Sequence, residues 1–160
     1  MVDRTQAALA AFLALFAAST ARADDFPTRK PGLWEIATTI AGTPRTSRLC
    51  VDAASEAAMI KKGVATRKDV CTRQEIHRSG NVLTDDSVCR PMSSEVTAHS
   101  VTTFTGDTAY STVVTARYNP PFMGKTDTTT TQEAKWLGPC GADMKPGDML
   151  VNGRIVHIGP

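Results

Sequence analysis

The stretch from Val70 to Arg90, VCTRQEIHRSGNVLTDDSVCR, has the pattern of a single β-hairpin. Its centre, Ser79-Gly80-Asn81, is rich in turn-forming residues, and a strand-like segment flanks it on each side. Each segment carries one cysteine, Cys71 or Cys89, and counting outward from the turn places the two nearly opposite each other. The hairpin therefore favours a disulfide between Cys71 and Cys89.

Residues 1–23 have the features of a cleaved secretory signal peptide. Ala7 to Ala18 is uncharged and apolar but too short to span a bilayer, and Ala21-Arg22-Ala23 supplies small residues where a signal peptidase cleaves. Cleavage there leaves residues 24–160, beginning at Asp24, as one mature β-rich domain. No later segment is apolar and long enough for a membrane helix, so we expect a periplasmic protein with no membrane span in the mature chain.

Export also changes what the four cysteines indicate. An even number of cysteines in an oxidising compartment predicts disulfides, here two, and no pair has the C-x-x-C spacing of a zinc or redox site. Four cysteines allow three pairings. The hairpin favours Cys71 with Cys89, which leaves Cys50 for Cys140 and would hold the tail, residues 138–160, against the fold.

Regular alternation of side chains predicts several β-strands. Leu33 to Ile40 and Thr126 to Trp136 both place apolar or inward side chains at every second position. Turn residues divide the rest of the chain into further segments, about seven strands in all. We therefore predict a mainly β, single-domain protein: a curved antiparallel β-meander or a partly open barrel, with one short α-helix and two disulfides. The Gly- and Pro-rich tail after Gly138 is expected to lie over the sheet.

The short helix is predicted directly after Cys50. Asp52 is a suitable N-cap, Ala53 to Lys62 are strong helix formers, and Gly63 is placed to end the helix. The stripe expected to face the sheet consists of Ala53, Ala57, Ile60 and Val64.

Three short motifs resemble one known family. Pro31-Gly32-Leu33-Trp34-Glu35, Cys50 just before a helix and Gly138-Pro139-Cys140 resemble, in order and spacing, the exported bacterial proteins grouped as domain of unknown function 3617. The tail Lys145-Pro146-Gly147-Asp148-Met149 also fits, so the resemblance covers about residues 31–148. It implies a periplasmic, β-rich, disulfide-bonded domain. It carries over no catalytic residue, because the family has no assigned activity.

The sequence assigns no catalytic residue, metal ligand or cofactor. Its three histidines lie far apart and lack any metal-binding spacing; they are His77, His99 and His157. Asp85 and Asp86 occupy adjacent strand positions and point to opposite faces, so they cannot act as a catalytic pair. Their expected role is to keep a strand soluble or to blunt a sheet edge. A net charge of +2 with scattered basic residues also gives no footprint for nucleic acid.

Apolar side chains on a loop keep a binding role open. Phe122 and Met123 follow two prolines, and adaptable apolar groups on loops are typical contact residues. The candidate ligand contacts, at the open end of a curved sheet, are Trp34, Phe122, Met123 and Trp136. We expect a non-catalytic binding or accessory module whose partner is an apolar small molecule or an envelope protein. The alternatives are a lipocalin-like carrier of a small apolar ligand and an enzyme of unrecognised type.

Overall fold

A computed structural model describes residues 26–159, so the predicted signal peptide lies outside the described residues. The described chain forms one helix and a single antiparallel sheet of nine strands. The helix is α1 (Ala53–Val70), and the strands are β1 (Gly32–Ile40), β2 (Thr43–Val51), β3 (Cys71–Ser79), β4 (Val82–Cys89), β5 (Glu95–Thr105), β6 (Ala109–Phe122), β7 (Lys125–Gly138), β8 (Asp148–Val151) and β9 (Arg154–His157).

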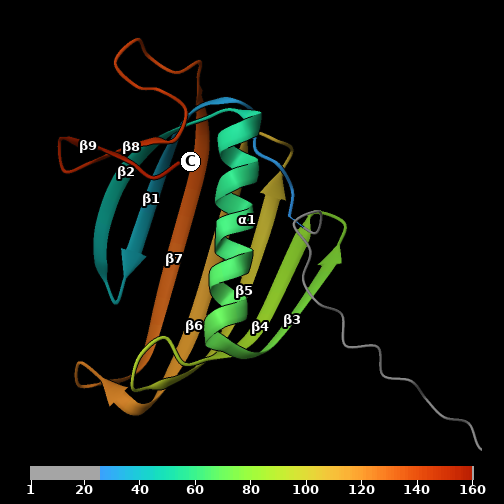
Figure 1. Ribbon diagram of the computed structural model, residues 1–160, viewed down its shortest axis with the longest axis vertical. Coiled ribbons are helices and arrows are strands. Elements are labelled where there is room, and N and C mark those ends of the chain that lie inside the picture. The colour runs from blue at the N-terminus through green and yellow to red at the C-terminus, as the bar shows by residue number, and fades with distance from the viewer. Residues whose placement is uncertain (1–25, 160) are drawn as a thin grey trace, which may run out of the picture.

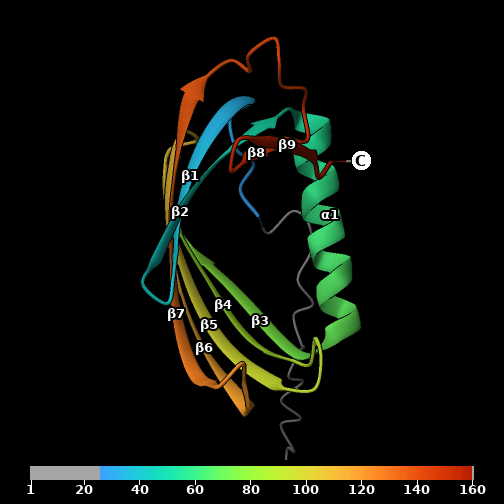
Figure 2. The same ribbon diagram turned by 90° about the vertical axis from the view of Figure 1, so that its left-hand side faces the viewer.

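The sheet is an open, curved meander, and α1 lies along its concave face (Figures 1 and 2). The strand order is β3-β4-β5-β6-β7-β1-β2-β8-β9, with β3 and β9 at the two edges. The sheet is therefore not closed into a barrel, and of the two predicted forms the curved antiparallel meander is confirmed. Alternation in β7 is also as predicted, because Thr128, Thr130 and Ala134 are more buried than the residues between them.

The hairpin of β3 and β4 has the predicted register. Strands β3 and β4 are joined by a turn at Gly80-Asn81, and Cys71 is the direct cross-strand partner of Cys89. These two cysteines form one disulfide, and Cys50 and Cys140 form the other. Both predicted pairings are confirmed, and all four cysteines are paired.

The helix is longer than predicted. Asp52 is the N-cap, and its carboxylate accepts from the backbone N–H of Ser55 at 2.7 Å while the Ser55 hydroxyl accepts from the N–H of Asp52 at 2.9 Å. The prediction that Gly63 ends the helix was wrong, since α1 continues for two more turns to Val70. A glycine inside a helix costs only about 1 kcal/mol relative to alanine. Three good helix formers follow Gly63 and can offset part of that cost: Ala65, Arg67 and Lys68.

The predicted inward stripe of α1 was also partly wrong. Ala53 and Ala57 are exposed, whereas Ser55 and Glu56 are buried. The apolar pattern of this helix is weak and does not decide which side faces the sheet. Glu56 is turned inward instead, because it forms an ion pair with Arg29 in the segment before β1. A buried charge is tolerated when an opposite charge pairs with it.

The prediction of about seven strands was too low, because the tail, which was expected to lie over the sheet, contributes two further strands to it. Strands β8 and β9 continue the sheet beyond β2, joined by a turn at Asn152-Gly153 with positive φ at both residues. An Asn-Gly pair between two short apolar segments is the local signal that could have located this hairpin. Met149 and Ile158, from this hairpin and just after it, pack against the main core.

The hydrophobic core is small. It lies where the neighbouring strands β7, β1 and β2 run side by side, near the start of β1. Its buried members are Trp34, Ile36, Leu49, Val51 and Ala134. Around β4, β5 and β6, by contrast, the space between sheet and helix is not filled by side chains.

Candidate ligand-binding cavity

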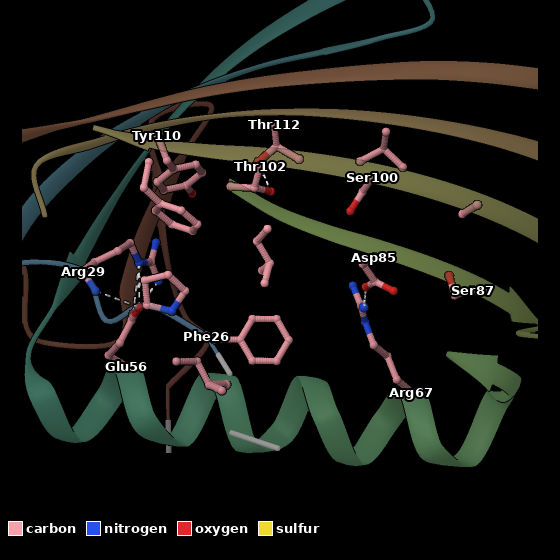
Figure 3. A pocket seen from close by; sticks show the side chains of 16 residues that line it. Phe26, Arg29, Glu56, Arg67, Asp85, Ser87, Ser100, Thr102, Tyr110 and Thr112 are labelled. Atoms are coloured by element: carbon pink, nitrogen blue, oxygen red, sulfur yellow. Dashed lines mark hydrogen bonds and ion pairs between the residues drawn. The ribbon is translucent and has the colours of Figure 1, made fainter. Parts of the chain in front are cut away.

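A cavity of about 360 Å³ lies between α1 and the concave face of the sheet (Figure 3). This volume falls within the range of small-molecule sites, although such sites extend to about 1,000 Å³. The lining residues come from the segment before β1, from α1 and from β4, β5 and β6: Phe26, Pro27, Arg29, Glu56, Ile60, Arg67, Leu83, Asp85, Ser87, Ala98, Ser100, Thr102, Phe104, Tyr110, Thr112 and Val114.

Strand alternation explains why these particular sheet residues line the cavity. Leu83, Asp85 and Ser87 are alternate residues of β4 and therefore share one face. In β5, Ser100 and Thr102 lie directly opposite Asp85 and Leu83. The floor of the cavity thus mixes apolar side chains with hydroxyl groups.

One end of the cavity is lined by the ion pair between Arg29 and Glu56. Nη2 of Arg29 lies 2.6 Å from Oε2 of Glu56, and Nε lies 2.9 Å from Oε1. The two side chains are 16% and 5% exposed, so this pair is almost fully removed from water. Burial alone would lower the pKa of Arg29, but hydrogen bonding and charge attraction from Glu56 outweigh it and raise that pKa.

Tyr110 lines the cavity beside this ion pair and also packs against the hydrophobic core. Its ring lies 6.0 Å from the Trp34 ring, and its hydroxyl donates to Oε1 of Gln132 at 3.2 Å. Burial raises the pKa of the Tyr110 phenol.

The other end of the cavity contains a second ion pair, Arg67 with Asp85. The Asp85 carboxylate also accepts from Nε2 of Gln74 at 3.2 Å. Asp85 and Asp86 do point to opposite faces, as predicted: Asp85 is buried in the cavity, and exposed Asp86 lies 2.8 Å from Nδ1 of His99. The expected surface role was wrong for Asp85, because β4 lies inside the sheet and this residue faces α1.

The four predicted ligand contacts are divided between the two ends of β7. Trp34 and Trp136 are cross-strand partners at the end of β7, and their indole N–H groups donate to the carbonyl oxygens of Lys30 and Pro31. Phe122, the last residue of β6, and Met123, in the turn that follows, lie at the opposite end of β7. The structure therefore brings each pair together but not the four as one group.

The two pairs also differ in burial. Trp34 is 1% exposed, whereas Met123 is 85% exposed beside Phe122, whose ring stacks on Tyr118 at 5.8 Å. None of the four is among the residues that line the cavity in the described part of the chain. Their role in ligand contact remains a prediction.

The histidines lie on separate surfaces. His77 is exposed on β3, His99 faces Asp86, and Nδ1 of His157 lies 2.8 Å from the Asp148 carboxylate. Within residues 26–159, no three potential metal-ligating side chains come together.

Sequence reasoning missed the four charged residues of the cavity, namely Arg29, Glu56, Arg67 and Asp85. Asp85 alone had a usable signal, because it shares the inward face of β4 with Leu83. The other three depend on how α1 and the segment before β1 approach the sheet.

These features define a class of protein: an open antiparallel sheet whose concave face is covered by one helix, with a cavity of mixed polarity between them. The family model described as "Protein of unknown function (DUF3617)" matches residues 29–140, and the chain belongs to this family. Neither a curated protein nor a solved structure matches the chain. In the described residues, no helix has the length and apolar character needed to cross a membrane.

Proposed function

We propose that this protein is a periplasmic binding protein that holds a small, partly apolar molecule between α1 and the sheet. The observation that carries the proposal is the cavity of about 360 Å³, which the protein's own small core leaves unfilled. Apolar side chains such as Leu83 and Val114 can contact a hydrocarbon portion, while hydroxyl groups and two ion pairs can orient a polar portion.

The proposal includes export. It is supported by the apolar segment and the Ala21-Arg22-Ala23 pattern, and by two disulfides, which persist in oxidising compartments. N-terminal sequencing of the protein from a periplasmic fraction should give Asp24 as the first residue. Recovery of protein that retains Met1 from the membrane fraction would contradict this.

The decisive test places a large side chain in the cavity and compares its effect on ligand binding with that of the same side chain on the opposite face of the same strand. Val114 lines the cavity, whereas its neighbour Val113 points to the other side of β6 and is 46% exposed. Val114→Trp should abolish binding of an apolar fluorescent probe and the co-purification of any small molecule seen by native mass spectrometry. Val113→Trp should bind as the unaltered protein does.

A second candidate function is docking of an envelope protein on the β6–β7 turn, favoured by the 85% exposure of Met123. The double substitution of Phe122 and Met123 to Ser distinguishes a binding site in the cavity from one on the β6–β7 turn. If the cavity is the site, this variant retains small-molecule binding. Loss of binding in it, with full binding by Val114→Trp, would overturn the cavity proposal.

A further inference from the structure

The two ion pairs of the cavity differ in how readily their arginine can leave. Arg29 is 16% exposed and contacts both carboxylate oxygens of Glu56, so separating this pair would place two buried charges without partners. Arg67 is 44% exposed and extends from the last turns of α1, whereas its partner Asp85 is 8% exposed on an inner strand. Figure 3 shows the Arg67 side chain reaching from α1 to Asp85 on the sheet. Because Arg67 is the more exposed of the two, it can turn outward into water, whereas Asp85 cannot leave the cavity.

This asymmetry selects the charge of a ligand. An anionic ligand that took Arg67 would leave the Asp85 carboxylate buried without a cation, which is strongly unfavourable. A cationic ligand that took Asp85 would release a half-exposed guanidinium to solvent, where it is readily hydrated. Exchange at this end is therefore favoured only for a cation.

The surroundings of Asp85 also suit an ammonium group. An alkylammonium carries three N–H donors and no acceptor. Ser100 lies directly opposite Asp85 on β5, and Ser87 is the next residue on the same face of β4. Their hydroxyl oxygens and the carboxylate can provide three acceptors, and Leu83, on the other side of Asp85, offers an apolar surface to the attached chain.

We propose that the cavity takes a primary alkylammonium compound, whose ammonium replaces Arg67 on Asp85 and whose alkyl chain extends along Leu83 toward Phe26. This inference rests on the proposed function, because it names the ligand class of the same cavity. Arg67 then acts as a built-in competitor that neutralises Asp85 until the ligand arrives.

The test uses three probes of equal chain length, octylammonium, 1-octanol and octanoate, titrated by calorimetry near neutral pH. Octylammonium should bind about tenfold more tightly than 1-octanol, the gain expected for hydrogen bonds to a charged group. Octanoate should bind more weakly than either probe. Asp85→Asn should remove the preference for octylammonium and leave 1-octanol unchanged.

Two further variants test whether Arg67 competes with the ligand and whether the ammonium binds at Asp85. Arg67→Gln should tighten octylammonium binding and not that of 1-octanol, because no internal cation then occupies Asp85. Asp86→Asn is the matched control, since Asp86 is an exposed carboxylate one residue away on the opposite face, and it should change neither affinity. Arg67→Gln leaves the Asp85 carboxylate without its cation, so circular dichroism must first show that this variant folds. If either single variant folds poorly, the double variant Arg67→Gln/Asp85→Asn removes both charges and should bind octylammonium no more tightly than 1-octanol.

The outcomes distinguish this inference from the proposed function. Equal binding of octylammonium and 1-octanol, or tighter binding of octanoate, overturns the inference while the cavity proposal stands. Failure of all three probes to bind overturns both. A preference for octylammonium that persists in Asp85→Asn also overturns the inference, because the ammonium would then bind elsewhere.

Discussion

Arg29 and Glu56 face each other between the segment before β1 and the first turns of α1, with 2.6 Å between Nη2 and Oε2. The backbone N–H of Arg29 also lies 3.5 Å from Oε1 of the same carboxylate. This ion pair connects the segment before β1 to α1, and it directs the Glu56 side chain toward the cavity. It explains why the inward face of α1 does not follow its alanines.

We predict that breaking this pair is costly and that removing it entirely is less so. Arg29→Met or Glu56→Met alone leaves one buried charge unpaired and should lower the free energy of unfolding by about 3–5 kcal/mol. The double variant should lose less than either single variant, because no unpaired charge remains. Urea unfolding at neutral pH measures all three. Arg117→Met, which breaks an exposed pair with Asp127, is the control and should change little.

Gly63 provides a test of where α1 ends. It lies inside the helix, it is exposed, and a Cβ added to it would contact nothing within 4 Å. Gly63→Ala should therefore raise the free energy of unfolding by about 0.5–1 kcal/mol. Gly80→Ala is the matched control: its site is equally open, but φ is +59°, so this substitution should destabilise. A loss of stability in Gly63→Ala would contradict the continuous helix.

The two disulfides should contribute unequally. Cys50 and Cys140 are separated by 90 residues, and Cys71 and Cys89 by 18. Loop-closure entropy predicts about 4.6 kcal/mol for the long loop and about 3.2 kcal/mol for the short one. Paired replacement by serine, followed by urea unfolding, should show a greater loss for Cys50/Cys140. A greater loss for Cys71/Cys89 would indicate that the loop length does not decide the difference.

Tyr110 should make stability decline in alkali. Burial raises the pKa of its phenol, so the folded protein favours the protonated form more than the unfolded chain does. This contribution is fully present below the ordinary tyrosine pKa of about 10, and it is lost as the pH rises through the raised value. Tyr110→Phe should show a shallower decline in unfolding free energy above about pH 10. The same decline in both proteins would exclude Tyr110 as its source.

Several parts of this protein could be predicted from the sequence because they depend on neighbours along the chain. The hairpin around Gly80 sets the register that pairs Cys71 with Cys89, and a period of two reveals the inward face of β7. The N-cap at Asp52 is equally local, since its partner Ser55 is three residues away. Strands β8 and β9 have a local signal too, the Asn152-Gly153 turn with positive φ at both residues.

The cavity and its charges depended on tertiary structure. Glu56 meets a partner 27 residues away and Asp85 meets one 18 residues away, and no periodic pattern in the sequence encodes either contact. The curvature of the sheet, and the position of α1 across it, decide which inward side chains reach each other and which leave a space. The sequence alone thus predicted β1 to β7 in outline, the β3–β4 hairpin and the two disulfides. Only the folded sheet placed a buried carboxylate opposite a half-exposed arginine in a cavity, because that arrangement depends on the distance between two layers.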